Sequence, residues 1–353
     1  MPRFEDWLFQ EQPGILGEIA RSPFSALSMV YGSAVALRTA AYHKQILQRH
    51  RLNIPVVAVG NLTLGGSGKT PTALWLARNL EQKGLKPAIS IRGYGSTAVN
   101  KLLVIDDPAR QNLDPEVVGD EACLIARKLK TIPILVGKNR FQAGQKAELL
   151  GAKILVLDDG FQHLKLIRDI DVVLVDGKKS ITKEKLFPRG RLREPASALN
   201  RAHLIILSRA EEDGEENVSE LKRLNPAAPI FKMRYRVKNQ DELAGKKAFA
   251  FAGIADPQYF FQTASRCKIE LVGQKAFSDH HRYSMAELEQ MEQEAAAASA
   301  ELMLTTEKDL ARLCGFEPRM PLRALEIEPD FFGRENELLE LVTAKSMEQK
   351  KNA

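Results

Sequence analysis

Residues 56–70 read Val-Val-Ala-Val-Gly-Asn-Leu-Thr-Leu-Gly-Gly-Ser-Gly-Lys-Thr, a β-branched run that leads into a glycine-rich loop. The loop ends in Gly68-Lys69-Thr70, and a helical pattern of apolar residues follows over 73–80. A strand, a phosphate loop and a helix in this order hold an anion, because the loop N–H groups and the helix N-terminus both face it. The stretch therefore predicts that the chain binds a nucleoside triphosphate.

The loop residues have distinct expected tasks. Lys69 reaches the terminal phosphates, and the Thr70 hydroxyl binds Mg²⁺. Thr63 stands where the usual pattern has its first glycine. A flexible linker with the same letters would lack the flanking strand and helix, so nucleotide binding is the favoured interpretation. The expected phosphate-binding residues are Gly65, Gly66, Ser67, Gly68, Lys69 and Thr70.

The composition is that of an ordinary globular chain. Its 353 residues correspond to about two domains, and a hydrophobic content of 44% suffices for a large core. A net charge of +6 is compatible with phosphorylated substrates and anionic lipid without selecting between them. The basic residues are not interleaved with aromatic ones, so no nucleic-acid partner is expected. Three widely separated cysteines argue against a disulfide framework and a zinc site.

Short apolar runs alternate with helical patterns over the first two-thirds of the chain. The expected strands cover residues 56–59, 88–91, 102–105, 132–136, 154–157, 172–175 and 204–207, and helical patterns cover 120–129 and 142–150. This alternation predicts an α/β fold of the P-loop NTPase type, with a mostly parallel sheet and helices on both faces. In such sheets ligands bind beyond the carboxyl ends of the strands.

Three regions are expected along the chain. Residues 1–50 form an N-terminal segment that associates with membranes. Residues 51–230 form the P-loop core, with 322–353 as a candidate return to it. Residues 231–321 form a smaller C-terminal αβ domain that closes over the site, and it begins with a connecting strand at 231–237. Within it, Ser284 and Glu287 form a capping box that opens a helix.

The N-terminal segment contains no charge over residues 22–37, and basic residues follow from Arg38 onward. The stretch is too short to span a membrane. The positions near helical spacing are Phe24, Leu27, Tyr31 and Ala34. They fit an amphipathic helix that lies on an anionic membrane face. A helix packed on the protein's own core fits the same spacing.

Two adjacent acids end the apolar run at 154–157. A P-loop enzyme needs an acid beside its Mg²⁺, and the end of a neighbouring strand delivers it there. An Asp-Gly turn explains one acid but not two. Asp158 and Asp159 are therefore predicted to lie beside the metal.

Asp120 begins a predicted helix in a loop on the ligand side of the sheet. One interpretation is an N-cap. The other is a catalytic base that takes the proton of an attacking hydroxyl. The helix N-terminus makes an aspartate a weaker base, and a partnered histidine would offset that effect.

Asp279-His280-His281 precedes the capped helix of the second domain. A metal site is disfavoured, because adjacent side chains rarely face one ion and no cysteine or third histidine lies nearby. Two interpretations remain: a base or base partner in an interdomain cleft, and a surface loop.

Together these segments resemble the tetraacyldisaccharide 4′-kinase family, the lipid A 4′-kinases. The matching motifs, in order from Val59 to Asp309, are GNLTLGGSGKTP, RGYG, GDE, GKNR, LDDGFQH, FPRGRLREP, FxDHH and TTEKD. Thr63 in place of the first glycine is itself the pattern of this family. The resemblance implies transfer of the γ-phosphate of ATP, with Mg²⁺, to the 4′-hydroxyl of an acylated glucosamine disaccharide 1-phosphate.

The matched motifs also imply roles for single residues. Asp120 resembles the catalytic base and is paired with His280, with His281 as the alternative. Lys69 acts at the phosphates during catalysis. The implied lipid-substrate contacts are Tyr94, Arg140 and Glu194, and Gln162 positions Mg²⁺-bound water or the base pair.

The resemblance further implies a peripheral enzyme on the cytoplasmic face of the inner membrane. Its partners would be the lipid substrate and the membrane surface, and no obligate protein partner is expected. The alternative is a membrane-associated P-loop NTPase switch that delivers cargo. Such a switch would use the same P-loop and Asp pair but would need no general base.

Overall fold

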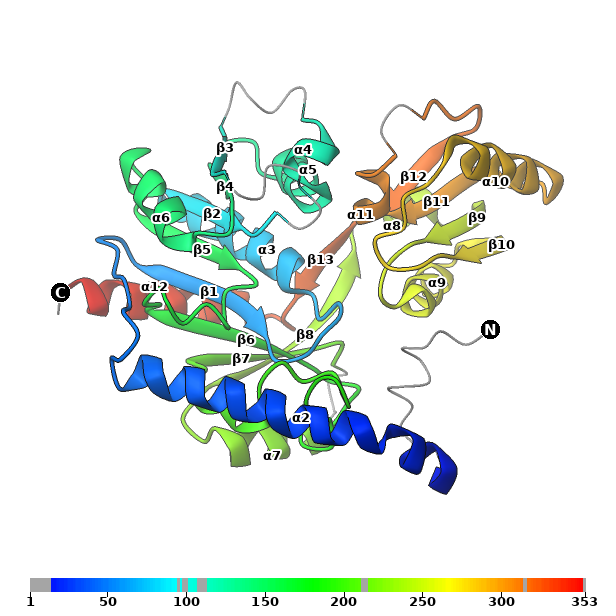
Figure 1. The fold of residues 1–353 in the computed structure, drawn as a ribbon. Helices are drawn as coiled ribbons and strands as arrows, with labels where there is room; N and C mark the ends of the chain where they lie inside the picture. The colour runs from blue at the N-terminus through cyan, green and yellow to red at the C-terminus, as the bar shows by residue number, and fades with distance from the viewer. Residues whose placement is uncertain are drawn as a thin grey trace.

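The computed structural model describes residues 14–93, 96, 101–106, 113–210, 215–313 and 316–351. Two β-sheets with helices on both faces make up this part of the chain (Figure 1). The larger sheet has nine strands and the smaller has four. The expected α/β fold with a smaller second αβ unit is thereby confirmed.

The larger sheet is parallel except at its two edges. Its strands, in order, are β13 (Ile327–Asp330), β8 (Ile230–Val237), β7 (Leu204–Ser208), β6 (Ile170–Asp176), β1 (Val56–Asn61), β5 (Ile154–Asp158), β2 (Pro87–Ile91), β4 (Ile134–Val136) and β3 (Leu103–Ile105). Only β13 and β3 run antiparallel to their neighbours in this sheet of the described chain. Val59 of β1 is in register with Asp158 of β5, so the strand that feeds the glycine-rich loop ends beside the Asp pair.

Alternation along β1 directs side chains into both layers of the core. Val57 and Val59 pack on the side of α3 and α12, whereas Val56 and Ala58 pack on the side of α6. Strands that are buried on both faces read as continuous apolar runs, as this one does. The helices around the larger sheet are α2 (Gly14–His43), α3 (Lys69–Gln82), α4 (Pro115–Val118), α5 (Asp120–Lys128), α6 (Arg140–Leu149), the 3₁₀ helix η2 (Ala196–Arg201), α7 (Glu215–Leu224) and α12 (Glu335–Lys351).

The smaller sheet is fully parallel. Its order is β10 (Glu270–Ala276), β9 (Lys247–Ala252), β11 (Leu302–Thr306) and β12 (Leu322–Leu325). The accompanying helices are α8 (Gln240–Leu243), α9 (Pro257–Arg266), α10 (Met285–Ala297) and α11 (Glu307–Leu310). The predicted capping box is present, since Ser284 and Glu287 bond each other's backbone at the start of α10.

Two strands join a different sheet from the one their position in the chain indicated. β8, expected as a connector into the second domain, pairs with β7 and β13 in the larger sheet. β12, expected to return to the core, pairs with β11 in the smaller sheet, and β13 makes the return instead. The local pattern identifies a strand, but only its pairing partner decides the sheet to which it belongs.

Helix α2 lies along the lower side of the larger sheet, as the blue helix in Figure 1 shows. Its Phe24 and Tyr31 are half-buried, whereas Leu27 is 55% exposed and Ala34 is exposed. The expected stripe therefore lies across the border between the covered and the exposed side of α2, because a spacing of three residues rotates Leu27 and Ala34 by about 60° from the other two. Within the described ranges, no helix has the length and apolarity that crossing a bilayer requires.

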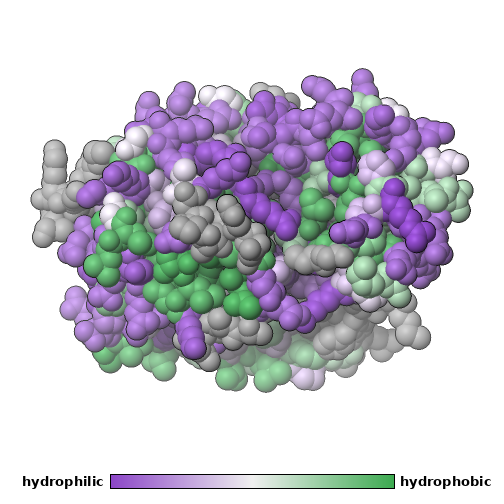
Figure 2. All heavy atoms as spheres, turned by 90° about the horizontal axis from the view of Figure 1, so that it is seen from above, coloured by the Kyte–Doolittle hydropathy of each residue, from purple (hydrophilic) through white to green (hydrophobic). Residues whose placement is uncertain are grey.

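Exposed apolar residues also occur away from α2. Figure 2, which looks down on the molecule from above, shows hydrophilic side chains along the upper edge and a hydrophobic area gathered on the left half. Among the large hydrophobic side chains outside α2, Val117 in α4 is 41% exposed and Leu149 in α6 is 81% exposed. These side chains provide comparison points for the exposed face of α2.

Candidate active site

The glycine-rich loop connects β1 to α3 in a conformation that glycine makes possible. Gly65 and Gly68 have φ angles of 101° and 87°. A Cβ atom on Gly68 would lie 1.6 Å from the Tyr235 hydroxyl, so no other residue fits there. Asn61 Nδ2 donates to Ser67 Oγ at 2.7 Å and ties the end of β1 to the loop. Helix α3 thus begins at Lys69, and the free N–H groups of its first turn lie at the loop.

Thr70 and Asp158 are joined by a hydrogen bond. Thr70 Oγ1 donates to Asp158 Oδ2 at 2.7 Å, while Asp158 Oδ1 is buried and has no hydrogen-bond partner among the described residues. Burial raises the pKa of Asp158 to about 7, the nearby Glu121 carboxylate adds to the rise, and the Thr70 hydroxyl opposes it. A buried carboxylate oxygen without a partner, beside the P-loop threonine, fits a Mg²⁺ ion, which is held by one or two carboxylates together with phosphate.

Asp159 faces two cations. Arg193 Nη1 donates to its two carboxylate oxygens at 3.0 and 2.9 Å, and Lys69 Nζ lies 3.7 Å from Oδ1. Burial raises the pKa of Asp159, but the charges of Lys69 and Arg193 outweigh burial and hold the pKa below its usual value. The two adjacent acids therefore have pKa values that are shifted in opposite directions, and Asp159 is the one that stays anionic.

Asp120 is the first residue of α5 and not its N-cap. Gly119 occupies the cap position, and Arg312 Nε donates to Asp120 Oδ2 at 2.7 Å. Burial raises the pKa of Asp120, but His280 and Arg312 lower it by more, so the net shift is downward. The carboxylate is therefore ionised at neutral pH and has an oxygen that can accept a proton.

Arg312 is held in place by the smaller αβ unit, which is built on the four-stranded sheet. Its side chain is 4% exposed, and Nη1 donates to the Gly253 carbonyl oxygen and to Asp309 Oδ1, each at 2.9 Å. The contact with Asp120 therefore joins the two units through a guanidinium that cannot easily reorient. No motif in the sequence points to this residue, which lies three positions beyond the TTEKD motif.

The structure separates the two histidines of the Asp-His-His segment. His280 Nδ1 lies 4.0 Å from Asp120 Oδ2 and 3.1 Å from Arg312 Nη2. His281 Nε2 lies 3.2 Å from Glu287 Oε1, and its ring stacks on Phe277 at a centroid distance of 4.5 Å. Only His280 is thus placed beside Asp120.

The residues expected to contact lipid are placed differently from those above. Arg140 is 3% exposed, and it donates to Ser90 Oγ at 3.1 Å and to the Asp158 carbonyl oxygen at 2.8 Å. Glu194 is 4% exposed and lies 2.8 Å from Arg201 Nη2. Tyr94 lies outside the described residues. Gln162 donates to the Asn61 carbonyl oxygen at 2.9 Å, next to the loop.

A cavity of about 560 Å³ lies between the phosphate loop, the Asp pair and His280. Asp120, Arg140, Gln162 and Glu194 are not among the residues that line it. The larger unit lines it with the loop residues 64–70, Asp158, Asp159 and Arg193, and the smaller unit lines it with Asp256, Tyr259, His280 and Lys308. Arg209 bridges the two units across it, pairing with Asp176 and with Asp256 at 2.6 Å. Because α5 contributes Glu121 and Leu124 to the wall, Asp120 stands at the edge of this cavity behind His280.

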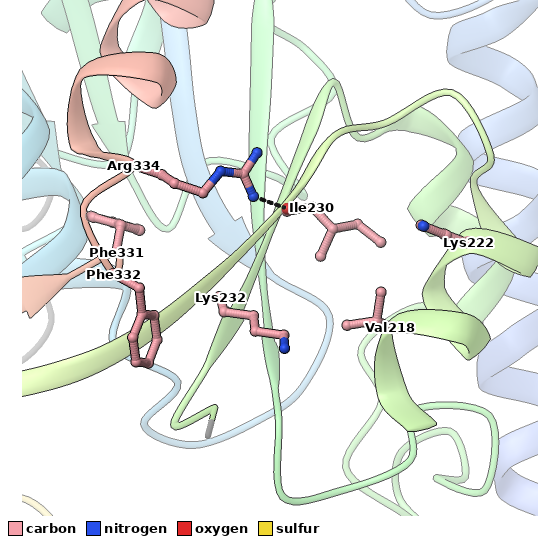
Figure 3. A pocket seen from close by; sticks show the side chains of 7 residues that line it. All are labelled: Val218, Lys222, Ile230, Lys232, Phe331, Phe332 and Arg334. Atoms are coloured by element: carbon pink, nitrogen blue, oxygen red, sulfur yellow. Dashed lines mark hydrogen bonds between the residues drawn. The ribbon is translucent and has the colours of Figure 1, made fainter. Parts of the chain in front are cut away.

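A second cavity, of about 450 Å³, lies elsewhere on the larger unit (Figure 3). Its lining consists of Val218, Lys222, Ile230, Lys232, Phe331, Phe332 and Arg334. Arg334 Nη1 donates to the Ile230 carbonyl oxygen at 3.3 Å, as the dashed line in Figure 3 marks. None of the residues predicted for the site from the sequence lines this cavity.

Comparison with known proteins agrees with the motifs. The family model of the tetraacyldisaccharide-1-P 4′-kinases (LpxK) matches residues 20–346. The chain is 36% identical over 309 residues to the tetraacyldisaccharide 4′-kinase of Desulfotalea psychrophila, covering 84% of this chain and 89% of that protein. It is 38% identical over 320 residues to the enzyme of that name from Anaeromyxobacter sp. strain K, covering 86% and 84%.

A solved structure shows the same fold. The crystal structure of LpxK from Aquifex aeolicus in complex with ATP superposes with a TM-score of 0.75 at 30% identity, and the match covers 92% of this chain and 99% of that one. The residues that the family model matches run from α2 to α12 and include the glycine-rich loop, the Asp pair and the His280 segment. The chain therefore belongs to the tetraacyldisaccharide 4′-kinase family of ATP-dependent kinases.

Proposed function

We propose that this chain transfers the γ-phosphate of ATP to the 4′-hydroxyl of an acylated glucosamine disaccharide 1-phosphate. The observation that carries the proposal is the shared cavity. The phosphate loop and the Asp pair form one wall, and His280, which lies 4.0 Å from Asp120, forms another. A phosphate donor and a hydroxyl acceptor would meet between these walls.

Thr70, Asp158 and Asp159 are the residues that would hold Mg²⁺. When bound there, Mg²⁺ would neutralise charge on the phosphates. Within the described ranges, no three His, Cys, Asp or Glu side chains gather as a metal-binding group. Two carboxylates and a hydroxyl are nevertheless enough, since Mg²⁺ in kinases takes its remaining ligands from phosphate and water.

The chain's own residues would carry the remaining steps. Lys69 and the loop N–H groups bind the phosphates and orient them in line with the acceptor. The acceptor oxygen forms a bond to the γ-phosphorus as the bond to the β–γ bridging oxygen breaks, and ADP leaves. Asp120 takes the proton of the hydroxyl. His280 and Arg312 orient the Asp120 carboxylate, because both lie against its Oδ2 atom.

The lipid-contact roles of Tyr94, Arg140 and Glu194 remain predictions of the resemblance. Arg140 and Glu194 are buried and bonded to protein groups, so either would need to become accessible to touch lipid. Both flank the site all the same, since Arg140 bonds the backbone of Asp158 and Glu194 follows Arg193.

We also propose that the enzyme is peripheral on the cytoplasmic face of the inner membrane. The support is the outer face of α2, where Leu27, Met29, Val30 and Leu37 are 55–74% exposed. An exposed apolar helix face followed by basic residues is typical of interfacial helices. The acyl chains of the substrate would then stay in the bilayer while the sugar enters the cavity.

Placing charge on this face is expected to weaken membrane binding without unfolding the protein. The Leu27→Glu/Val30→Glu variant should bind vesicles of phosphatidylglycerol and phosphatidylethanolamine less tightly, because glutamate disfavours the anionic interface. Leu149→Glu is the control, since Leu149 lies on another helix and is 81% exposed, against 55% for Leu27 and 69% for Val30. Vesicle co-sedimentation measures the effect. A large fall in thermal midpoint without lipid would show that this face packs against protein, because buried unpaired charges cost several kcal/mol.

The reaction itself is tested with purified full-length protein. Incubation with γ-labelled ATP and detergent-solubilised acylated glucosamine disaccharide 1-phosphate should move the label to the lipid. ATP turnover should depend on the lipid, because Asp120 needs an acceptor hydroxyl to deprotonate. Turnover that ignores the lipid and leaves it unlabelled would favour the cargo-delivering NTPase switch.

A further inference from the structure

The inner face of α2 does more than attach the helix to the protein. Ser28 Oγ lies 2.9 Å from the Leu186 carbonyl oxygen and accepts a hydrogen bond from Arg189 N at 3.0 Å. Tyr31 Oη donates to the Arg193 carbonyl oxygen at 2.8 Å. The two elements are packed closely, since a Cβ on Gly32 would lie 2.9 Å from a Leu186 methyl group. The inner face of α2 therefore holds the loop of residues 186–193 both near its start, at Leu186, and at its end, at Arg193.

The opposite edge of loop 186–193 is bonded to the entry of the phosphate loop. Leu64 N donates to the Arg191 carbonyl oxygen and Arg193 N donates to the Leu62 carbonyl oxygen, each at 2.7 Å. Thr63 and Leu192 form an antiparallel bridge between these two bonds. Loop 186–193 is thus a single layer between α2 and the backbone that leads into Gly65–Thr70.

The same loop also contains Arg193, whose guanidinium binds Asp159. Arg193 donates to both carboxylate oxygens of Asp159, and its carbonyl oxygen is the group that Tyr31 binds. An unbroken series of hydrogen bonds therefore runs from α2 through residue 193 to the acid beside Lys69. Displacing the main chain of residue 193 would displace both the guanidinium and the loop entry.

We propose that the inner face of α2 is a positioning element of the phosphate site, acting through loop 186–193 on Arg193 and on the entry of the phosphate loop. Ser28 and Tyr31 are positioning residues in this scheme. Arg193 is the residue through which they reach Asp159. The proposal rests on the proposed kinase function only in taking this site as the ATP site.

The test measures ATP binding in dodecyl maltoside micelles, where the vesicle surface plays no part. The Ser28→Ala/Tyr31→Phe variant of the full chain should bind ATP with Mg²⁺ about ten-fold more weakly by titration calorimetry, an effect of the size that residues outside a binding site exert through packed contacts. The KM for ATP should rise and the KM for lipid in micelles should not. Ser33→Ala is the matched control and should bind ATP like wild type, because the Ser33 hydroxyl donates to the Met29 carbonyl oxygen of its own helix and has no other partner in the described part of the chain.

A double-mutant cycle tests the route through Arg193. Arg193→Lys keeps the charge but loses the paired contact, so ATP affinity should fall. When Ser28→Ala/Tyr31→Phe is added to Arg193→Lys, ATP affinity should fall by less than the product of the two separate fold-changes. The reason is that both changes act through the position of residue 193. Independent effects, or unchanged affinity in a folded Ser28→Ala/Tyr31→Phe chain, would overturn the proposal. Tyr31→Phe alone serves if the double variant fails to fold. A wild-type chain that binds no ATP would instead overturn the proposed function.

Discussion

Replacing Lys69 by alanine is expected to lower the rate of phosphate transfer by about two to three orders of magnitude, the usual cost of removing one preorganised charge-stabilising donor. Lys69 lines the cavity at the start of α3 and lies 3.7 Å from Asp159. Its ammonium group thus lies next to the carboxylates proposed to hold Mg²⁺, at the place where negative charge would develop on the phosphates during transfer. The fold should survive, because Arg193 still neutralises Asp159.

Steady-state assays with labelled ATP and micellar lipid measure this loss. Lys83→Ala is the matched control, because Lys83 is exposed at the other end of the same helix. Thr70 offers a second arm: Thr70→Ala removes the hydroxyl that bonds Asp158, whereas Thr70→Ser keeps it. Full activity of Lys69→Ala, or equal losses in Thr70→Ala and Thr70→Ser, would contradict the assignment of this loop.

Replacing Asp120 by asparagine is expected to lower kcat by about two to four orders of magnitude, the range that a general base supplies. The affinity for ATP should stay within a few-fold of wild type, because Asp120 lies outside the phosphate loop. Asparagine keeps the size and a hydrogen-bonding oxygen for Arg312 but has no carboxylate to accept a proton. Titration calorimetry for ATP and steady-state rates for transfer separate the two effects.

The neighbouring acid Asp114 provides the control for that experiment. It caps α4 by accepting a hydrogen bond from Glu116 N, so Asp114→Asn changes the same functional group with no partner in the cavity. His280→Ala should add little to Asp120→Asn, since groups that act as a unit are not additive. If ATP binding falls in parallel with turnover in Asp120→Asn, the residue supports the metal or the fold and is not the base.

Several features followed from the sequence because they are local. The glycine-rich loop, its strand and its helix occupy neighbouring positions, and glycine is required where φ is positive. The Asp pair could be placed beside that loop because parallel strands end at one edge of a sheet, and the register of β1 with β5 shows it there. The fold class also followed from a local feature, the alternation of short apolar runs with helical patterns along the chain.

The tertiary structure alone decided contacts between distant segments. Asp120 and Arg312 are 192 positions apart, and Tyr31 and Arg193 are 162 positions apart, so no spacing rule could link them. The structure also chose His280 over His281, because the segment turns one ring to Asp120 and the other to Phe277. It showed that α2 has one exposed face and one face bonded to loop 186–193, a division that the spacing of its apolar residues does not reveal. Local sequence sets the conformation of each segment, whereas partners across the fold are set by how the segments pack, and side-chain hydrogen bonds depend on that packing.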